Sequence, residues 1–154
     1  MQKRMLFVFN SKAGKGKIKT KLPEIIDIFN SHRYEVIIRS TQARRDAYEQ
    51  TKLYHDKVDL IVCSGGDGTL DEVVTGVMEV KSKIPIGYIP AGSTNDFANS
   101  LFMPKTMEEA AENIMQEVPY HCDIGRFNRQ TFAYVAAFGI FTDVSYQTNQ
   151  DMKK

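Results

Sequence analysis

A glycine-rich turn, Gly65-Gly66-Asp67-Gly68-Thr69, constrains this chain more than any other feature. It follows an apolar run at residues 60–63, typical of a buried strand, and precedes apolar residues at helical spacing, so we expect a helix to begin at Thr69 or Leu70. Because glycine has no side chain, backbone N–H groups there can lie against a ligand, and the partly positive helix N-terminus is directed at the same place. The turn therefore favours a phosphate-bearing ligand. Asp67 would repel a bare phosphate, which indicates a metal-bound phosphate or a polar group held in fixed register.

Strand-like and helical segments alternate along the first 120 residues. Apolar runs predict strands covered on both faces at residues 5–9, 34–39, 58–64 and 84–90. Helices are predicted between and after them, within residues 18–29, 44–57, 70–78, 97–101 and 107–115. This alternation predicts an α/β fold with an open, mostly parallel sheet flanked by helices.

The pattern changes after residue 120. Two strand-like runs, residues 121–127 and 131–138, are separated by residues 128–130, which is a hairpin signal rather than a strand–helix–strand unit. We therefore expect an α/β domain over residues 1–120. Residues 121–154 would begin a second, antiparallel domain that this chain does not complete.

Composition excludes some classes of protein. The 154 residues have a formal net charge of +1, so charge gives no reason to expect a nucleic-acid partner. Cys63 and Cys122 are expected to be buried free thiols of a reducing cytosol. No apolar run has the length of about 18 residues that a membrane-spanning helix needs. We expect a cytoplasmic protein, and this leaves contact with a membrane surface open.

Three polar loops follow predicted strands, at residues 10–17, 65–69 and 92–96. In open α/β sheets, ligands bind beyond the carboxyl ends of the strands. All three loops fall at such ends, as does Thr41 after the second strand, so we predict one shared site for a nucleotide or phosphate. The lysines of the first loop either contact phosphate or are ordinary solvated charges: Lys12, Lys15 and Lys17.

Two common phosphate-binding signatures are absent. The P-loop pattern Gly-x-x-x-x-Gly-Lys-Ser/Thr fails because neither Ser nor Thr follows Gly16-Lys17. The dinucleotide pattern Gly-x-Gly-x-x-Gly fails because Gly66 and Gly68 lead to Asp71 rather than glycine. P-loop NTPases and ordinary Rossmann dehydrogenases are therefore disfavoured.

Three carboxylates accompany these segments. Asp67 lies in the glycine turn, Asp96 in the third loop, and Asp123 near the start of the region after residue 120. Asp96 is either the N-cap of the next helix or a ligand, and Asp123 either accepts backbone N–H groups or has a functional role. In the functional interpretation these acids hold Mg²⁺ through water, since Mg²⁺ dehydrates reluctantly and takes few protein ligands.

Two motifs together resemble the diacylglycerol kinase catalytic domain family, which includes bacterial diacylglycerol kinases, YegS-like lipid kinases, and sphingosine and ceramide kinases. They are Gly65-Gly66-Asp67-Gly68-Thr69-Leu70-x-Glu72 and Pro90-Ala91-Gly92-Ser93-Thr94-Asn95-Asp96-Phe97-Ala98. The first is shared with NAD kinases and phosphofructokinases, whereas the second is more specific to lipid kinases. The loop Asn10-Ser11-Lys12-Ala13-Gly14 resembles the family's Asn-Pro-x-Ser-Gly turn, with Ser and Ala in place of Pro and Ser. The resemblance covers essentially the whole chain.

The resemblance implies transfer of the γ-phosphoryl group of ATP, with Mg²⁺, to the hydroxyl of diacylglycerol or a similar lipid, giving phosphatidic acid. Carried over position by position, the residues expected to contact the nucleotide are Asn10, Ser11, Lys12, Ala13, Gly14, Thr41, Gly66, Asp67, Gly68, Thr69, Leu70, Asp71, Glu72 and Thr94. The carboxylate and water network near Mg²⁺ would include Asp67, Asp96 and Asp123. Expected partners are the lipid and, transiently, a membrane surface at which the protein is peripheral; a homodimer is left open.

Two features depart from the family. Asp71 stands where many relatives have Asn, which affects polar contacts near the nucleotide. Relatives are also longer, and their second domain, a β-sandwich, closes over the nucleotide and supplies the catalytic base and further Mg²⁺ ligands. We therefore expect the catalytic residues beyond residue 154, and we expect these 154 residues alone to be inactive or very weakly active.

Two alternatives remain. An NAD-kinase-like enzyme would share the glycine turn, but residues 90–96 argue against it. A non-catalytic nucleotide-binding module is favoured by the missing second domain.

Overall fold

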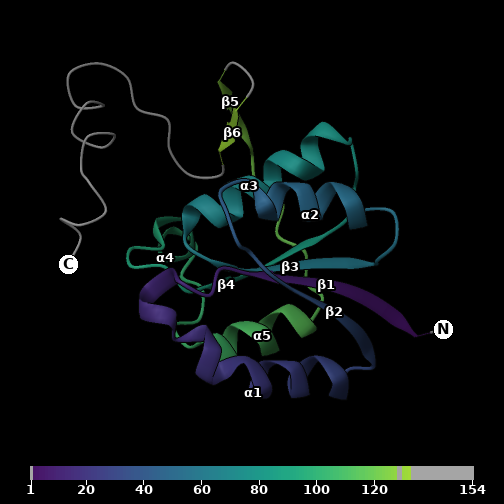
Figure 1. Cartoon of the computed structure of the whole chain (residues 1–154), viewed down its shortest axis with the longest axis vertical. Coiled ribbons are helices and arrows are strands. Elements are labelled where there is room, and N and C mark those ends of the chain that lie inside the picture. Colours follow the sequence, from purple (N-terminus) through teal and green to yellow (C-terminus); the bar gives the residue numbers. More distant parts are fainter. Residues whose placement is uncertain (1, 128–129, 133–154) are drawn as a thin grey trace.

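The computed structural model of the chain describes residues 2–127 and 130–132 (Figure 1). Its centre is a parallel sheet with the strand order β2-β1-β3-β4, which confirms the predicted open α/β architecture. The four strands are β1 (Lys3–Phe9), β2 (Tyr34–Ser40), β3 (Leu60–Gly65) and β4 (Ile86–Pro90).

Helices cover both faces of this sheet (Figure 1). The first polar loop contains a short 3₁₀ helix, η1 (Ala13–Gly16). The α-helices of the described part are α1 (Ile18–Ser31), α2 (Asp46–Tyr54), α3 (Asp67–Glu79), α4 (Asp96–Ser100) and α5 (Met107–Met115). Helices α1 and α5 contact each other on one face, whereas α2 and α3 contact each other on the opposite face.

The central strand β1 divides the core into two layers. Met5 and Phe7 pack in the cluster that contains side chains of α1 and α5. Leu6 and Val8 point to the opposite cluster, with side chains of α3. All four side chains are fully buried, so the absence of alternation in this run reflects a strand covered on both faces. Burial of each such side chain contributes about 1.5–3 kcal/mol to the stability of the fold. Strand β1 is therefore held firmly at the centre of the sheet and supports the loops at the strand ends.

Some element boundaries differ from the sequence-based prediction. Helix α2 begins at Asp46 instead of Arg44, because Arg45 has left-handed backbone angles with φ at 71°. Helix α3 begins at Asp67, two residues before Thr69, because Gly66 is already its N-cap. The glycine turn is therefore shorter than expected, and Asp67 is a helical residue rather than the middle of a loop.

A short hairpin follows the α/β unit and contacts α3. It consists of β5 (Gly125–Phe127) and β6 (Gln130–Phe132), which pair antiparallel as predicted, although the first strand begins later than residue 121. The rest of the second predicted strand, residues 133–138, lies outside the described residues. The division into two domains therefore stays a prediction.

The two cysteines differ in environment. Cys63 is fully buried in β3, and burial raises the pKa of its thiol to about 12. Cys122 is exposed, so the expectation that both thiols are buried was wrong for this residue. It lies in the irregular segment between α5 and β5, where no strand or helix of the described residues covers it.

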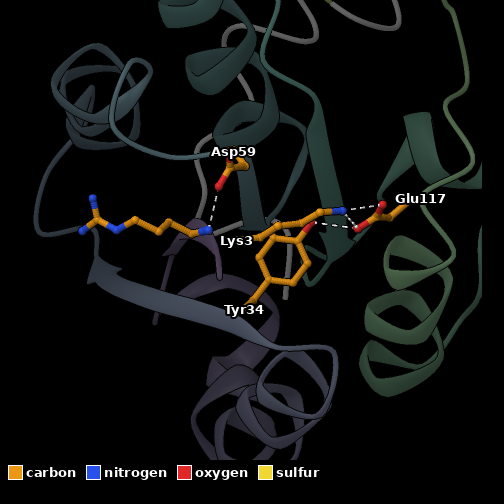
Figure 2. Close-up of polar contacts among 5 residues, drawn as sticks. Lys3, Tyr34, Asp59 and Glu117 are labelled. Atoms are coloured by element: carbon orange, nitrogen blue, oxygen red, sulfur yellow. Dashed lines mark hydrogen bonds and ion pairs between the residues drawn. The ribbon is translucent and has the colours of Figure 1, made fainter. Parts of the chain in front are cut away.

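The amino ends of the strands carry a polar cluster of Lys3, Tyr34 and Glu117 (Figure 2). Lys3 Nζ lies 2.6 Å from Glu117 Oε1, and the Tyr34 hydroxyl donates to the same oxygen at 2.9 Å. Burial and this bond raise the pKa of Tyr34 to about 12, while Lys3 and Tyr34 lower the pKa of Glu117. The cluster joins the end of α5 to β1 and β2, at the edge opposite the one where α/β proteins bind ligands.

Candidate functional site

The carboxyl ends of the strands are aligned by backbone hydrogen bonds. Thr41 N donates to Phe9 O at 2.9 Å, just after β2. Asn10 N donates to Ser64 O at 2.8 Å, just after β1. Because each bond continues the parallel ladder, the loops that follow these strands leave the sheet from one edge.

Glycines bring the three loops into backbone contact. Gly14 has φ at +53°, and a Cβ on it would collide with the carbonyl oxygen of Ala91. A Cβ on Gly92 would lie 2.6 Å from Gly66 Cα. The first loop therefore packs on the third, and the third packs on the glycine turn. The predicted convergence of the three loops is present in the structure.

The N-terminus of α3 opens into this convergence. Its N-cap, Gly66, has no side chain to bond the first N–H groups of the helix, and its own carbonyl accepts Thr69 N at 3.0 Å. Apart from its chain neighbours and the adjoining backbone of α3, no heavy atom of the described residues lies within 4 Å of the place where a Cβ on Gly68 would stand. An uncapped helix N-terminus beside open space is suited to a phosphate, because the N–H groups and the helix dipole both attract negative charge.

Asp67 connects the glycine turn to α4. Its Oδ2 accepts the backbone N–H of Asp96 at 3.0 Å, and its Oδ1 accepts that of Phe97 at 3.2 Å. The residue before α4, Asn95, makes no side-chain cap of that helix. Asp67 therefore caps α4 from another helix, while Asp96 itself supplies a backbone donor.

Glu72, one and a half turns further along α3, reaches the start of α2. Its Oε1 accepts Arg45 N at 2.8 Å, and its Oε2 accepts Ala47 N at 3.2 Å. Asp67 and Glu72, two of the four acids of α3, are thus each bonded to the first turn of a neighbouring helix.

Two further residues hold the third loop, and neither was among the predicted site residues; Asn95 was considered only as a helix N-cap, a role its side chain does not take. Asn95 Oδ1 accepts Gly92 N at 2.8 Å, and Asn95 Nδ2 donates to Gly92 O at 2.9 Å. Beneath them the Tyr88 hydroxyl donates to Gly65 O at 3.1 Å. Burial and the nearby Asp67 charge raise the pKa of Tyr88, which keeps its hydroxyl protonated. A hydroxyl-bearing residue in an otherwise apolar strand was the available signal for Tyr88.

Comparison with known proteins agrees with this arrangement. The sequence profile of the diacylglycerol kinase catalytic domain matches residues 4–127. The chain belongs to the diacylglycerol kinase catalytic domain family.

The matching relatives are about twice as long as this chain. The chain is 34% identical over 154 residues to a diacylglycerol kinase of Staphylococcus aureus (strain bovine RF122 / ET3-1), covering 99% of this chain and 49% of the relative. It is 34% identical to a diacylglycerol kinase of Staphylococcus carnosus (strain TM300), covering 99% and 50%. A crystal structure of a diacylglycerol kinase from Bacillus anthracis str. Sterne matches with a TM-score of 0.77 and 32% identity, covering 84% of this chain and 49% of that one. The chain thus spans about half the length of the curated relatives it matches.

The first loop of this family member is folded on itself. Asn10 Oδ1 accepts Lys12 N at 2.9 Å, which closes a turn that leaves the lysine side chain exposed. Ser11 and Ala13 are half-buried, and Gly14 fills the contact with the third loop. The exposed lysines of this loop lie on the same edge as the α3 N-terminus, where they add positive charge: Lys12, Lys15 and Lys17.

The other residues predicted to contact the nucleotide differ in whether their side chains are buried or exposed. Thr69 and Leu70 have buried side chains, so only their backbone atoms face the loop edge. A Cβ on Gly65 would lie 2.7 Å from Thr69 Cβ, which shows how closely that side chain packs under the turn. Thr41 and Asp71 are half-buried, and Thr94 is exposed on the third loop.

The three acids predicted to surround Mg²⁺ are not gathered in one cluster. Among the described residues, no group of three or more His, Cys, Asp or Glu side chains is arranged to hold a metal ion. Asp67 and Asp96 are adjacent through their hydrogen bond, whereas Asp123 is exposed in the segment after α5. Carboxylate oxygens suit Mg²⁺, so Asp67 can take part in its water shell through its remaining lone pairs. The described part of the chain does not complete such a site.

A separate hollow of about 670 Å³ lies between α1 and α5. Its lining includes Phe102 and the acids Glu108, Glu109 and Glu112. Negative charge there would repel a nucleotide phosphate, so the strand-end loops remain the candidate site.

None of the helices in the described residues is long and apolar enough to cross a membrane.

Proposed function

We propose that this chain is the nucleotide-binding part of an ATP-dependent lipid kinase. The reaction would transfer the γ-phosphoryl group of ATP to the hydroxyl of diacylglycerol or a similar lipid, giving phosphatidic acid and ADP. The observation that carries the proposal is the convergence of three glycine-containing loops on the open N-terminus of α3, in a member of this family.

In this proposal the phosphates lie against the backbone of Gly66 and Gly68. The helix N-terminus and the lysines of the first loop neutralise their charge, and the open space at Gly68 admits them. When bound, Mg²⁺ would neutralise charge on the β- and γ-phosphates. Asp67 would orient water around that ion while it keeps α4 in place.

The lipid hydroxyl oxygen attacks the γ-phosphorus, and the bond to the bridging β–γ oxygen breaks, so ADP leaves. The hydroxyl proton passes to a general base, which family resemblance assigns to a segment beyond residue 154. The 154 residues would therefore bind ATP and catalyse little or no transfer. Because diacylglycerol resides in membranes, the enzyme would act at a membrane surface.

Calorimetric titration of the chain with ATP and Mg²⁺, together with transfer of labelled phosphate to diacylglycerol vesicles, tests this proposal. We expect ATP binding without appreciable phosphatidic acid. Joining the chain to the C-terminal half of a relative should restore transfer. Absence of ATP binding would refute the proposal, and efficient turnover by the chain alone would refute the assignment of the base.

A second candidate is a non-catalytic nucleotide-binding module, which would use the same three loops and the same open N-terminus of α3. It predicts ATP binding that never becomes transfer, even when the missing half is supplied. An NAD-kinase-like activity is less favoured. The two hydrogen bonds between the Asn95 side chain and the Gly92 backbone hold residues 90–98, the motif that resembles lipid kinases. Phosphorylation of NAD in preference to diacylglycerol by the joined protein would support it.

A further inference from the structure

Helix α2 has no cap of its own. Its N-cap residue, Arg45, makes no side-chain cap and has a left-handed backbone with φ at 71°, an unfavourable conformation for a residue with a Cβ. The bonds that hold this start come from Glu72 on α3, with one carboxylate oxygen on Arg45 N and the other on Ala47 N. A negative carboxylate is also favoured there by the helix dipole.

The segment between β2 and α2 is held at both ends. At one end, Thr41 N is bonded to Phe9 O at the tip of β1. Near the other end, Gln42 N donates to Asp46 Oδ2 at 2.7 Å, and Ala47 is fully buried in the core. Further along α2, Tyr48 and Lys52 are also bonded to α3, through Glu79. The Glu72 carboxylate is the hydrogen-bonded link nearest to this segment, and it joins the segment to α3, the helix whose N-terminus faces the candidate site.

Thr41 and the N-terminus of α3 lie at different places along the edge of the sheet that carries the candidate site. In the strand order β2-β1-β3-β4, Thr41 follows a strand that is two positions from β3. Neighbouring strands lie about 4.8 Å apart, so the two points are separated by roughly 10 Å. If the phosphates occupy the α3 end, the Thr41 end is left for the nucleoside.

We infer that Glu72 is a positioning residue that sets Thr41 against the nucleoside part of ATP, acting through Arg45 and Ala47 rather than through a phosphate contact. This inference rests on the proposed function. It assigns separate tasks to two acids of α3: Asp67 holds α4 beside the phosphate end, and Glu72 holds the loop before α2 at the nucleoside end.

The test compares ATP with inorganic tripolyphosphate, which has the phosphates and no nucleoside. In Glu72→Gln, a carbonyl oxygen keeps one bond and the amide group faces the other N–H, so one bond is lost. We expect ATP affinity to fall about tenfold and tripolyphosphate affinity to change by less than about twofold. Hydrogen exchange at the Arg45 and Ala47 amides should become faster. Glu49→Gln, an equal charge change on an exposed residue of α2, should alter none of these values.

Coupling to Thr41 supplies a second readout. Thr41→Val should weaken ATP and spare tripolyphosphate in the same way, and the double variant should be no worse than the weaker single variant. This variant also tests the nucleoside assignment if Glu72→Gln does not fold.

Several results would overturn the inference. Equal loss of ATP and tripolyphosphate would place the effect at the phosphate end, and weaker ATP binding with unchanged exchange at Arg45 and Ala47 would make Glu72 a direct contact. Additive losses in the double variant, or a wild-type chain that binds ATP but not tripolyphosphate, would also contradict it. If the wild-type chain binds no ATP at all, the proposed function fails, and amide exchange still decides whether Glu72 holds the start of α2.

Discussion

The carboxylate of Asp67 accepts a hydrogen bond from the backbone N–H of Asp96, with 3.0 Å between Oδ2 and N. This bond joins the first residue of α3 to the first residue of α4, so the glycine turn and the third loop form one structural unit. An acid expected at a metal therefore also has a structural task that needs no metal.

Asp67→Asn separates these two tasks. The amide keeps one acceptor for α4 but presents its N–H₂ group to the other backbone N–H, so we expect a loss of about 1–2 kcal/mol in the free energy of unfolding. Urea denaturation without Mg²⁺ measures this loss directly. If stability without Mg²⁺ is unchanged and only ATP–Mg²⁺ binding suffers, the capping role is wrong.

Gly14→Ala should disrupt the contact between the first and third loops. The new Cβ would meet the Ala91 carbonyl oxygen, and alanine is also unfavourable at φ of +53°. We expect a stability loss of about 1–3 kcal/mol and weaker ATP binding. Thermal unfolding and calorimetry check both values. A variant with wild-type stability would show that the loops do not pack as described.

Gly68→Ala should affect binding without harming the fold. Apart from its chain neighbours and the adjoining backbone of α3, a Cβ there meets no atom within 4 Å in the described part of the chain, and alanine favours helix. Stability should therefore stay equal or rise by up to about 1 kcal/mol. ATP affinity should fall about tenfold, since the methyl group occupies space assigned to the phosphates.

Gly76→Ala is the matched control in the same helix. A Cβ on Gly76 would lie 2.9 Å from Thr51 Cβ, far from the loops, so stability should fall while the folded protein keeps its ATP affinity. If Gly68→Ala kept its ATP affinity and Gly76→Ala lost it, the phosphates could not be assigned to the N-terminus of α3.

The raised pKa of Tyr34 leads us to expect that the free energy of unfolding falls at alkaline pH. Its pKa is raised from 10.0 to about 12 by burial and by its bond to Glu117, so between these values the unfolded chain loses the proton before the folded one does. Stability contributed by Tyr34 is therefore complete below pH 10 and declines as pH rises toward 12. Tyr34→Phe should cost about 1 kcal/mol at neutral pH and flatten this decline. Parallel alkaline slopes for wild type and variant would contradict the assignment.

The sequence was informative about the sheet because the strand segments have a simple physical signature. Strand β1 is a short apolar run without alternation, and only burial on both faces explains such a run. The glycines at 14, 66 and 92 stand where the backbones of the three loops approach closely: Gly14 meets the third loop at Ala91, and Gly92 of that loop meets Gly66.

The partners of Asp67 and Glu72 were not predictable in the same way. Each carboxylate bonds backbone N–H groups more than 20 residues away, and every residue except proline has such a group. Arg45 shows the same limit, since its left-handed backbone makes the predicted helix begin two residues late without any glycine to signal it. Tertiary contacts, rather than local preference, decide these features.

The central claim is that three strand-end loops form one nucleotide site, and titration of the ¹⁵N-labelled chain with ATP and Mg²⁺ tests it most directly. The account predicts that the largest amide shift changes occur together at Gly14, Gly68 and Thr94, one in each loop. Changes centred on Glu108, Glu109 and Glu112 of the hollow between α1 and α5, with the loop amides unmoved, would contradict it.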